Sequence, residues 1–151
     1  MHAGKSVAIL LALYGPVVAQ EREWTFDTGE QDAYLIFGVP QTDDTGVSFW
    51  CPIGSGEIHI FVPETSQALK PDTAVHIDVA VGDKTFGFDG KAQANEESGV
   101  PSAEAVIDAK DAVFAALQSA DRFTVKVPGD TEVYPLAGAD FPSLLRTCKK
   151  P

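Results

Sequence analysis

The stretch TAVHIDVAVGDKTFGFDGKAQA, residues 73–94, decides the fold class of this 151-residue chain. In residues 73–81, valine and isoleucine alternate with polar or small residues, which is the period of a strand with one buried face. Gly82 and Asp83 suit a two-residue turn, and Asp89 with Gly90 forms a dipeptide that favours a type I′ hairpin. We therefore predict three meandering strands over residues 73–81, 85–88 and 91–94.

Similar patterns recur on both sides of this stretch. Residues 102–109 fit a strand or a helix, residues 111–120 have the period of an amphipathic helix, and Asp140 can cap a closing helix. Further strands are predicted over residues 24–26, 33–39, 47–51, 57–62, 122–127 and 132–136. About nine strands and one or two short helices predict a mainly β fold, an antiparallel β-sandwich or open barrel.

The first nineteen residues have the pattern of a secretory signal peptide. Lys5 is followed by an apolar run over residues 7–14, a Gly-Pro break, and small residues up to Ala19. The apolar run is too short to cross a bilayer, which needs about 20 residues of helix. We expect cleavage before Gln20, no membrane insertion afterwards, and a single β-rich domain over residues 20–151 that is periplasmic or secreted.

The formal net charge of −11 limits the partners that the chain can bind. Such a surface repels phosphate backbones and anionic headgroups, so nucleic acid and membrane surfaces are not expected as partners. A cationic envelope protein or peptide fits the charge, and the chain would then act as its inhibitor or escort, with a lysozyme as one example. The alternative is that the charge serves solubility alone.

The two cysteines, Cys51 and Cys148, are expected to form a disulfide, because an isolated pair in an oxidising compartment is usually bridged. The bridge would connect the last element of the chain to an early strand. A redox role is the alternative, but the pair lacks the CxxC spacing that lowers a thiol pKa.

His59 and His76 lie on the polar faces of two predicted strands that follow one another along the chain. Glu57 and Asp78 are two positions away on the same faces. If the two strands pair, these residues offer two nitrogen and two oxygen donors, a set that zinc accepts. The alternative is that both histidines are simply solvated, and no cofactor is otherwise expected.

No catalytic motif stands out. The Gly54-Ser55-Gly56 segment lacks the flanking pattern of a nucleophile elbow, and adjacent acids such as Asp43 and Asp44 are typical of a turn or, at most, a loop calcium site. We therefore predict a binding module without catalysis. The alternative is an envelope hydrolase or metal-dependent enzyme that uses His59 and His76.

Trp50 is a candidate contact for a partner. It follows Phe49, so the two side chains point to opposite faces of their strand. An exposed Trp50 would be available to a partner; the alternative is that Trp24, Phe49 and Trp50 all lie in the core.

Four segments together resemble a known family. They are the leader, the WTF run at residues 24–26, the VSFWC strand ending at Cys51, and the YPLAGADFPSLLRTC stretch ending at Cys148. In these the chain resembles the secreted invasion-associated locus B proteins of alphaproteobacteria and their exported relatives. The resemblance implies a periplasmic or secreted β-sandwich, and it assigns no catalytic residue.

Overall fold

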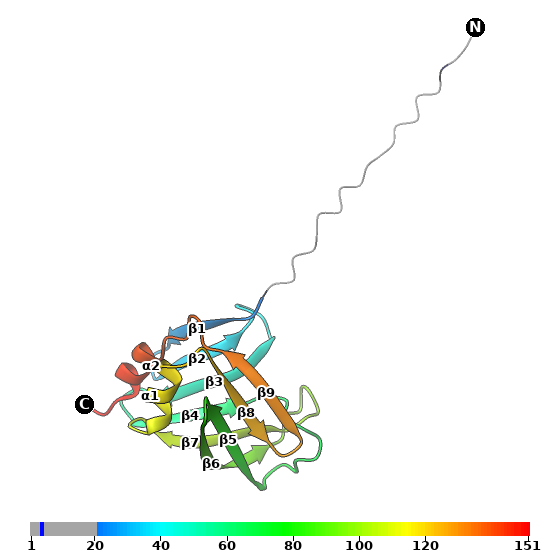
Figure 1. Ribbon diagram of the computed structural model, residues 1–151. Helices are drawn as coiled ribbons and strands as arrows, with labels where there is room; N and C mark the ends of the chain where they lie inside the picture. Colours follow the sequence, from blue (N-terminus) through cyan, green and yellow to red (C-terminus); the bar gives the residue numbers. More distant parts are fainter. Residues whose placement is uncertain (1–3, 5–20) are drawn as a thin grey trace.

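Nine strands form one curled antiparallel sheet (Figure 1) in the computed structural model, which describes residue 4 and residues 21–151. Apart from Gly4, the predicted signal peptide lies outside the described residues. The sheet order is β1-β2-β3-β4-β7-β6-β5-β8-β9, which confirms the predicted mainly β fold and fits an antiparallel β-sandwich or open barrel. The strands are β1 (Glu23–Thr28), β2 (Asp32–Gly38), β3 (Thr45–Pro52), β4 (Glu57–Val62), β5 (Ala74–Val81), β6 (Lys84–Gln93), β7 (Ser102–Asp108), β8 (Arg122–Val127) and β9 (Asp130–Pro135).

The predicted hairpin at Asp89 and Gly90 is wrong. These residues lie inside β6, a continuous strand of ten residues, and Gly90 pairs with Ala105 of β7. A Cβ at Gly90 would overlap the carbonyl oxygen of Glu104, so this glycine serves the close approach of two strands and not a turn. The turn predicted at Gly82 is present, with a φ of 62°.

The segment 102–109, which fitted a strand or a helix, forms strand β7 over Ser102–Asp108. This strand lies between β4 and β6 and therefore separates β4 from the β5–β6 hairpin. The described residues form nine strands, the number predicted, because two differences cancel. The strands expected at residues 85–88 and 91–94 are one strand, β6, and β7 is an additional strand.

The core lies inside the curl of the sheet. Alternate side chains of each strand point inward, as in β4, where Ile58 and Ile60 are fully buried. Aromatic rings fill the centre: those of Phe37, Phe49, Phe123 and Phe141 lie 5.3–6.4 Å from the ring of Trp24. Close offset or tilted packing of this kind adds to the free energy gained from burying apolar area.

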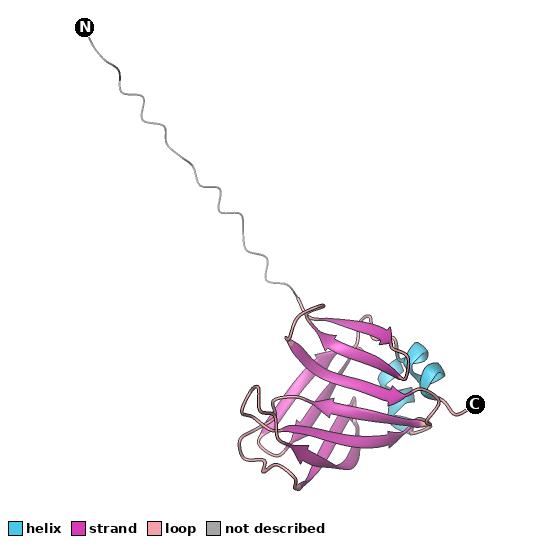
Figure 2. Cartoon of the chain, turned by 180° about the vertical axis from the view of Figure 1, so that it is seen from behind, coloured by secondary structure: helices cyan, strands magenta, loops and turns pink. Residues whose placement is uncertain are grey.

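Two short helices cover one end of the curled sheet, as Figures 1 and 2 show. The first, α1 (Ala112–Gln118), begins after Asp111, whose carboxylate accepts the Val113 N–H. The second, α2 (Phe141–Cys148), begins after the predicted cap Asp140, whose carboxylate accepts the Ser143 N–H at 3.1 Å. Neither helix in the described part of the chain is long enough to cross a membrane.

The two outer edges of the sheet, β1 and β9, approach each other and are joined by side chains. Trp24 Nε1 donates a hydrogen bond to the carbonyl oxygen of Pro135 at 2.7 Å. Just before β1, Arg22 lies 2.6 Å from Asp44 and 3.8 Å from Glu132 of β9. We call this line of contacts the seam.

Candidate binding surfaces

The predicted disulfide between Cys51 and Cys148 is present. The two Cα atoms are 5.8 Å apart, the residues are separated by 97 positions, and both side chains are fully buried. The bridge connects the end of α2 to β3, so it fixes the C-terminal segment against the sheet.

The strands that carry His59 and His76 do not pair, so the condition for a shared site is not met. His59 lies on β4 and His76 on β5, and β7 and β6 separate them in the sheet. Three strand spacings of about 4.8 Å place the two residues roughly 14 Å apart along the sheet surface. The set formed with Glu57 and Asp78 is therefore not assembled into one site, because strands adjacent in sequence are not adjacent in space.

Each histidine instead has acidic partners of its own. His59 Nδ1 lies 2.7 Å from Glu104 Oε1. His76 lies 3.0 Å from Asp78 and 2.9 Å from Asp89, and the hydrogen bond with Asp89, with help from Asp78, raises the pKa of this exposed imidazole. Residues 21–151 contain no group of three or more His, Cys, Asp or Glu side chains arranged to hold a metal ion.

Trp50 lies on the outer surface of the sheet, whereas Trp24 and Phe49 are buried. Across neighbouring strands Trp50 pairs with Tyr34 of β2 and His59 of β4. The ring centroid of Trp50 is 6.3 Å from that of Tyr34 and 4.1 Å from that of His59, both in stacked orientations. We call Tyr34, Trp50 and His59 the outer aromatic row.

The strands around this row are acidic on their outer side. The neighbouring strands β1, β2, β3, β4 and β7 contain no lysine or arginine. Alternation places all of their acidic side chains on the outer surface: Glu23, Asp27, Asp32, Glu57, Glu104 and Asp108. We call the outer surface of these five strands the acidic face. Figure 2 shows these strands side by side.

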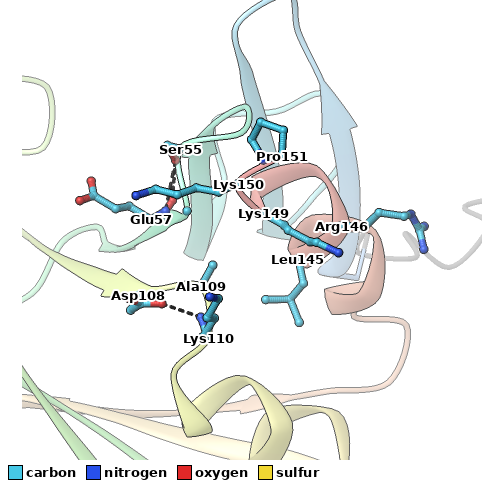
Figure 3. Close-up of a pocket in the computed structure, with 11 residues that line it drawn as sticks. Ser55, Glu57, Asp108, Ala109, Lys110, Leu145, Arg146, Lys149, Lys150 and Pro151 are labelled. Atoms are coloured by element: carbon cyan, nitrogen blue, oxygen red, sulfur yellow. Dashed lines mark hydrogen bonds between the residues drawn. The ribbon is translucent and has the colours of Figure 1, made fainter.

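Next to this face, at the helical end of the molecule, lies a pocket of about 610 Å³ (Figure 3). Its walls come from the turn between β3 and β4, the segment after β7, and the C-terminal part of α2 with the tail that follows. We call it the C-terminal pocket. It is lined by Ser55, Gly56, Glu57, Asp108, Ala109, Lys110, Leu145, Arg146, Lys149, Lys150 and Pro151.

Sequence reasoning did not find this pocket. Lys149 and Lys150 follow the closing helix, where cations complement the negative helix end, and that explanation needs no pocket. Lys110 lies about 40 positions earlier and carries no local signal of its own. Only the disulfide, which places the tail against β3, could have suggested that these cations meet the β3–β4 turn.

Comparison with protein-family models, with curated proteins and with solved structures finds no match for this chain. The resemblance to invasion-associated locus B proteins therefore stays a prediction.

Proposed function

We propose that this chain is a periplasmic or secreted binding module without catalysis, whose acidic face binds a cationic segment of an envelope protein or peptide. The leader pattern and the buried disulfide support the compartment, because cystines persist where the environment is oxidising. The alternative enzyme with His59 and His76 in one site gains no support, since the two rings lie on separate parts of the sheet.

The charge distribution of the acidic face is the observation on which the proposal rests. Five neighbouring strands offer six acidic side chains and no lysine or arginine, and of the six only Glu104 has a histidine partner, His59, on these strands. Such a surface attracts cationic partners over a distance comparable to the Debye length, about 8 Å at physiological salt, and speeds their association. It also repels acidic proteins, which gives selectivity.

The outer aromatic row gives this face a contact that does not depend on charge alone. Tyr34 is 37% exposed, and Val106, opposite His59 on β7, is 51% exposed, so an apolar strip crosses the acidic face. Lysine and arginine combine a charged head with a long apolar stem. Their stems fit against the strip while their heads reach carboxylates such as Asp32 and Glu104. Trp50, at the centre of the row, is positioned to be the main energetic contact.

Binding to lysozyme, a cationic protein, tests the proposal by titration calorimetry at low and at physiological salt. Acetylated lysozyme, which has lost its lysine charges, is the matched control ligand. We expect binding of the unmodified protein only, weakened by salt. Trp50→Ala should reduce the affinity at least tenfold, as expected for the removal of a central aromatic contact.

Val133→Ala serves as the control variant. Val133 is 59% exposed on β9, which is not one of the five strands of the acidic face and carries no residue of the outer aromatic row, so its replacement should leave the affinity unchanged. Equal binding of native and acetylated lysozyme would contradict the cationic partner, and equal loss in the two variants would contradict the role of the outer aromatic row.

A further inference from the structure

The C-terminal pocket concentrates positive charge in a chain that is otherwise strongly acidic. Four of the eleven lysine and arginine residues of the sequence line it: Lys110, Arg146, Lys149 and Lys150. In the described part of the chain, the basic side chains with a nitrogen within 4 Å of a carboxylate oxygen are Arg22, His59 and His76. None of the four cations of the pocket forms such an ion pair with a described residue. The positive charge of the pocket is therefore available to a ligand.

The helix end accounts for only part of this charge. Arg146 lies in the last turn of α2, where a cation is favoured by the helix dipole, and its Nη2 donates to Ser143 Oγ at 3.2 Å. In Figure 3 its side chain points away from Lys110 and Lys150. Lys110 belongs to the segment between β7 and α1, so its position in the pocket has no relation to the end of α2.

The walls of the pocket are held in place without a ligand. The disulfide fixes the end of α2, Gly54 N–H donates to the carbonyl of Thr147 at 3.1 Å, and Gly56 N–H donates to that of Cys148 at 2.7 Å. The third wall is tied to the same turn, because Ala109 N–H donates to the carbonyl of Gly56 at 2.9 Å. A pocket that is already ordered loses little conformational entropy when it binds a ligand.

The absence of a side chain at Gly56 gives Lys150 its place. A Cβ at this glycine would lie 2.9 Å from Cγ and 3.0 Å from Cε of Lys150, so the lysine stem lies directly on the glycine backbone. Gly56 also has a φ of 75°, a conformation that other residues rarely adopt. The turn thus both orders the pocket and leaves room for a cation at its rim.

The remaining lining residues narrow the chemistry of the ligand. Leu145, Ala109 and Pro151 offer apolar surface between the lysines, which suits a ligand with an apolar body. Glu57 and Asp108, paired across β4 and β7, also line the pocket and disfavour ligands with several negative charges. The volume of about 610 Å³ is within the usual range of roughly 300–1,000 Å³ for small-molecule sites.

We infer that the C-terminal pocket binds a small organic anion, a single carboxylate or sulfonate on an apolar body. The positive charge of Lys110, Lys149 and Lys150 attracts the anionic head, and Leu145 contacts the apolar body. The site is separate from the outer aromatic row, so it binds its ligand whether or not the acidic face binds a cationic protein.

Titration calorimetry with octanoate at neutral pH tests this inference, with octanol and inorganic phosphate as comparison ligands. We expect octanoate to bind, and octanol and phosphate to bind at least tenfold more weakly, because each lacks one of the two features that the pocket recognises. Binding of octanol as tight as that of octanoate would overturn the role of the lysines. Equally tight binding of phosphate would overturn the organic class of the ligand.

A pair of double variants separates the pocket from the overall charge of the protein. Lys149→Gln with Lys150→Gln should weaken octanoate binding roughly tenfold or more, since each charge near the head contributes a factor of about five. Lys84→Gln with Lys126→Gln changes the net charge equally at exposed positions on β6 and β8 and should leave the affinity unchanged. Equal affinities in the two double variants would overturn the inference.

Glu57→Gln gives a test of opposite sign. Removing this carboxylate from the rim should tighten octanoate binding roughly twofold to fivefold. Urea midpoints equal to that of the unmodified protein show that the variants are folded, and a decrease in affinity for a folded Glu57→Gln would contradict the proposed placement of the anion.

Discussion

Removal of the disulfide should destabilise the protein by about 4–5 kcal/mol. The bridge joins positions separated by 97 residues, and in the chain-entropy model closing a loop of that length lowers the entropy of the unfolded chain by an amount worth about 4.7 kcal/mol at 25 °C. Because native domains are stable by only about 5–15 kcal/mol, this loss is a large part of the total. Alanine is the suitable replacement at Cys51 and Cys148, since both positions are fully buried and serine would leave a hydroxyl without a partner.

Urea unfolding of the double alanine variant measures this loss. With a slope of about 2 kcal/mol per molar urea, the midpoint should fall by about 2–2.5 M. The near-UV circular dichroism of the folded variant should stay close to that of the oxidised protein, because the bonds from Gly54 and Gly56 to the end of α2 do not involve sulfur. The unmodified protein under reducing conditions should behave like the variant. A fall of less than about 0.5 M at unchanged slope would refute the reasoning.

Three further predictions concern single residues. Titration by NMR should give His76 a pKa above its ordinary value of 6.5, and Asp89→Asn should return the pKa toward that value. The stabilisation from the His76–Asp89 pair should be complete below pH 6.5 and should be lost as the pH rises through the folded-state pKa of His76. Gly90→Ala should lower the free energy of unfolding in urea by about 2 kcal/mol or more, because the added Cβ would overlap the backbone of β7. Gly29→Ala is the control, because a Cβ there makes only an ordinary contact at 3.7 Å. Asp140→Ala should lower the free energy of unfolding by about 1 kcal/mol, because α2 loses its N-terminal cap. Hydrogen bonds from Ser143 lower the pKa of the Asp140 carboxyl, so the cap stabilises the fold above pH 3.8, and this stabilisation is lost as the pH falls through the lower folded-state pKa. Urea unfolding of both proteins at several pH values measures this dependence.

The elements that the sequence predicted well are those with a strong local signal. The alternation in residues 73–81 and in Glu57–Val62 continues over a whole strand, and Asp140 caps α2 through the side-chain contact that its residue type favours. In these segments local preference and tertiary burial agree, so no distant contact is needed to define the element.

The errors arise where a distant strand overrides a local preference. Asp89 and Gly90 favour a hairpin when considered alone, yet β7 approaches Gly90 so closely that a continuous strand forms instead. The same strand separates β4 from β6, and this placement keeps His59 away from His76. Pairing order in a sheet depends on long-range contacts, which the spacing of two histidines does not encode.

The two candidate surfaces differ in how much of each the sequence revealed. The alternation of Phe49 and Trp50 showed that one of these rings had to face outward, but not which one. The acidic face is implicit in the sequence, because residues 23–69 contain no lysine or arginine. The C-terminal pocket depends on three segments that only the folded chain and its disulfide bring together.

The seam between β1 and β9 bears on the solubility of the protein. An uncovered strand edge is a template onto which another chain can add a strand and begin aggregation. Here the two edges face each other across the bond from Trp24 Nε1 to the carbonyl of Pro135, and that proline has no N–H to offer to an incoming strand. Loss of the indole donor, as in Trp24→Phe, would therefore leave a carbonyl unpaired and open a route to self-association of otherwise folded molecules.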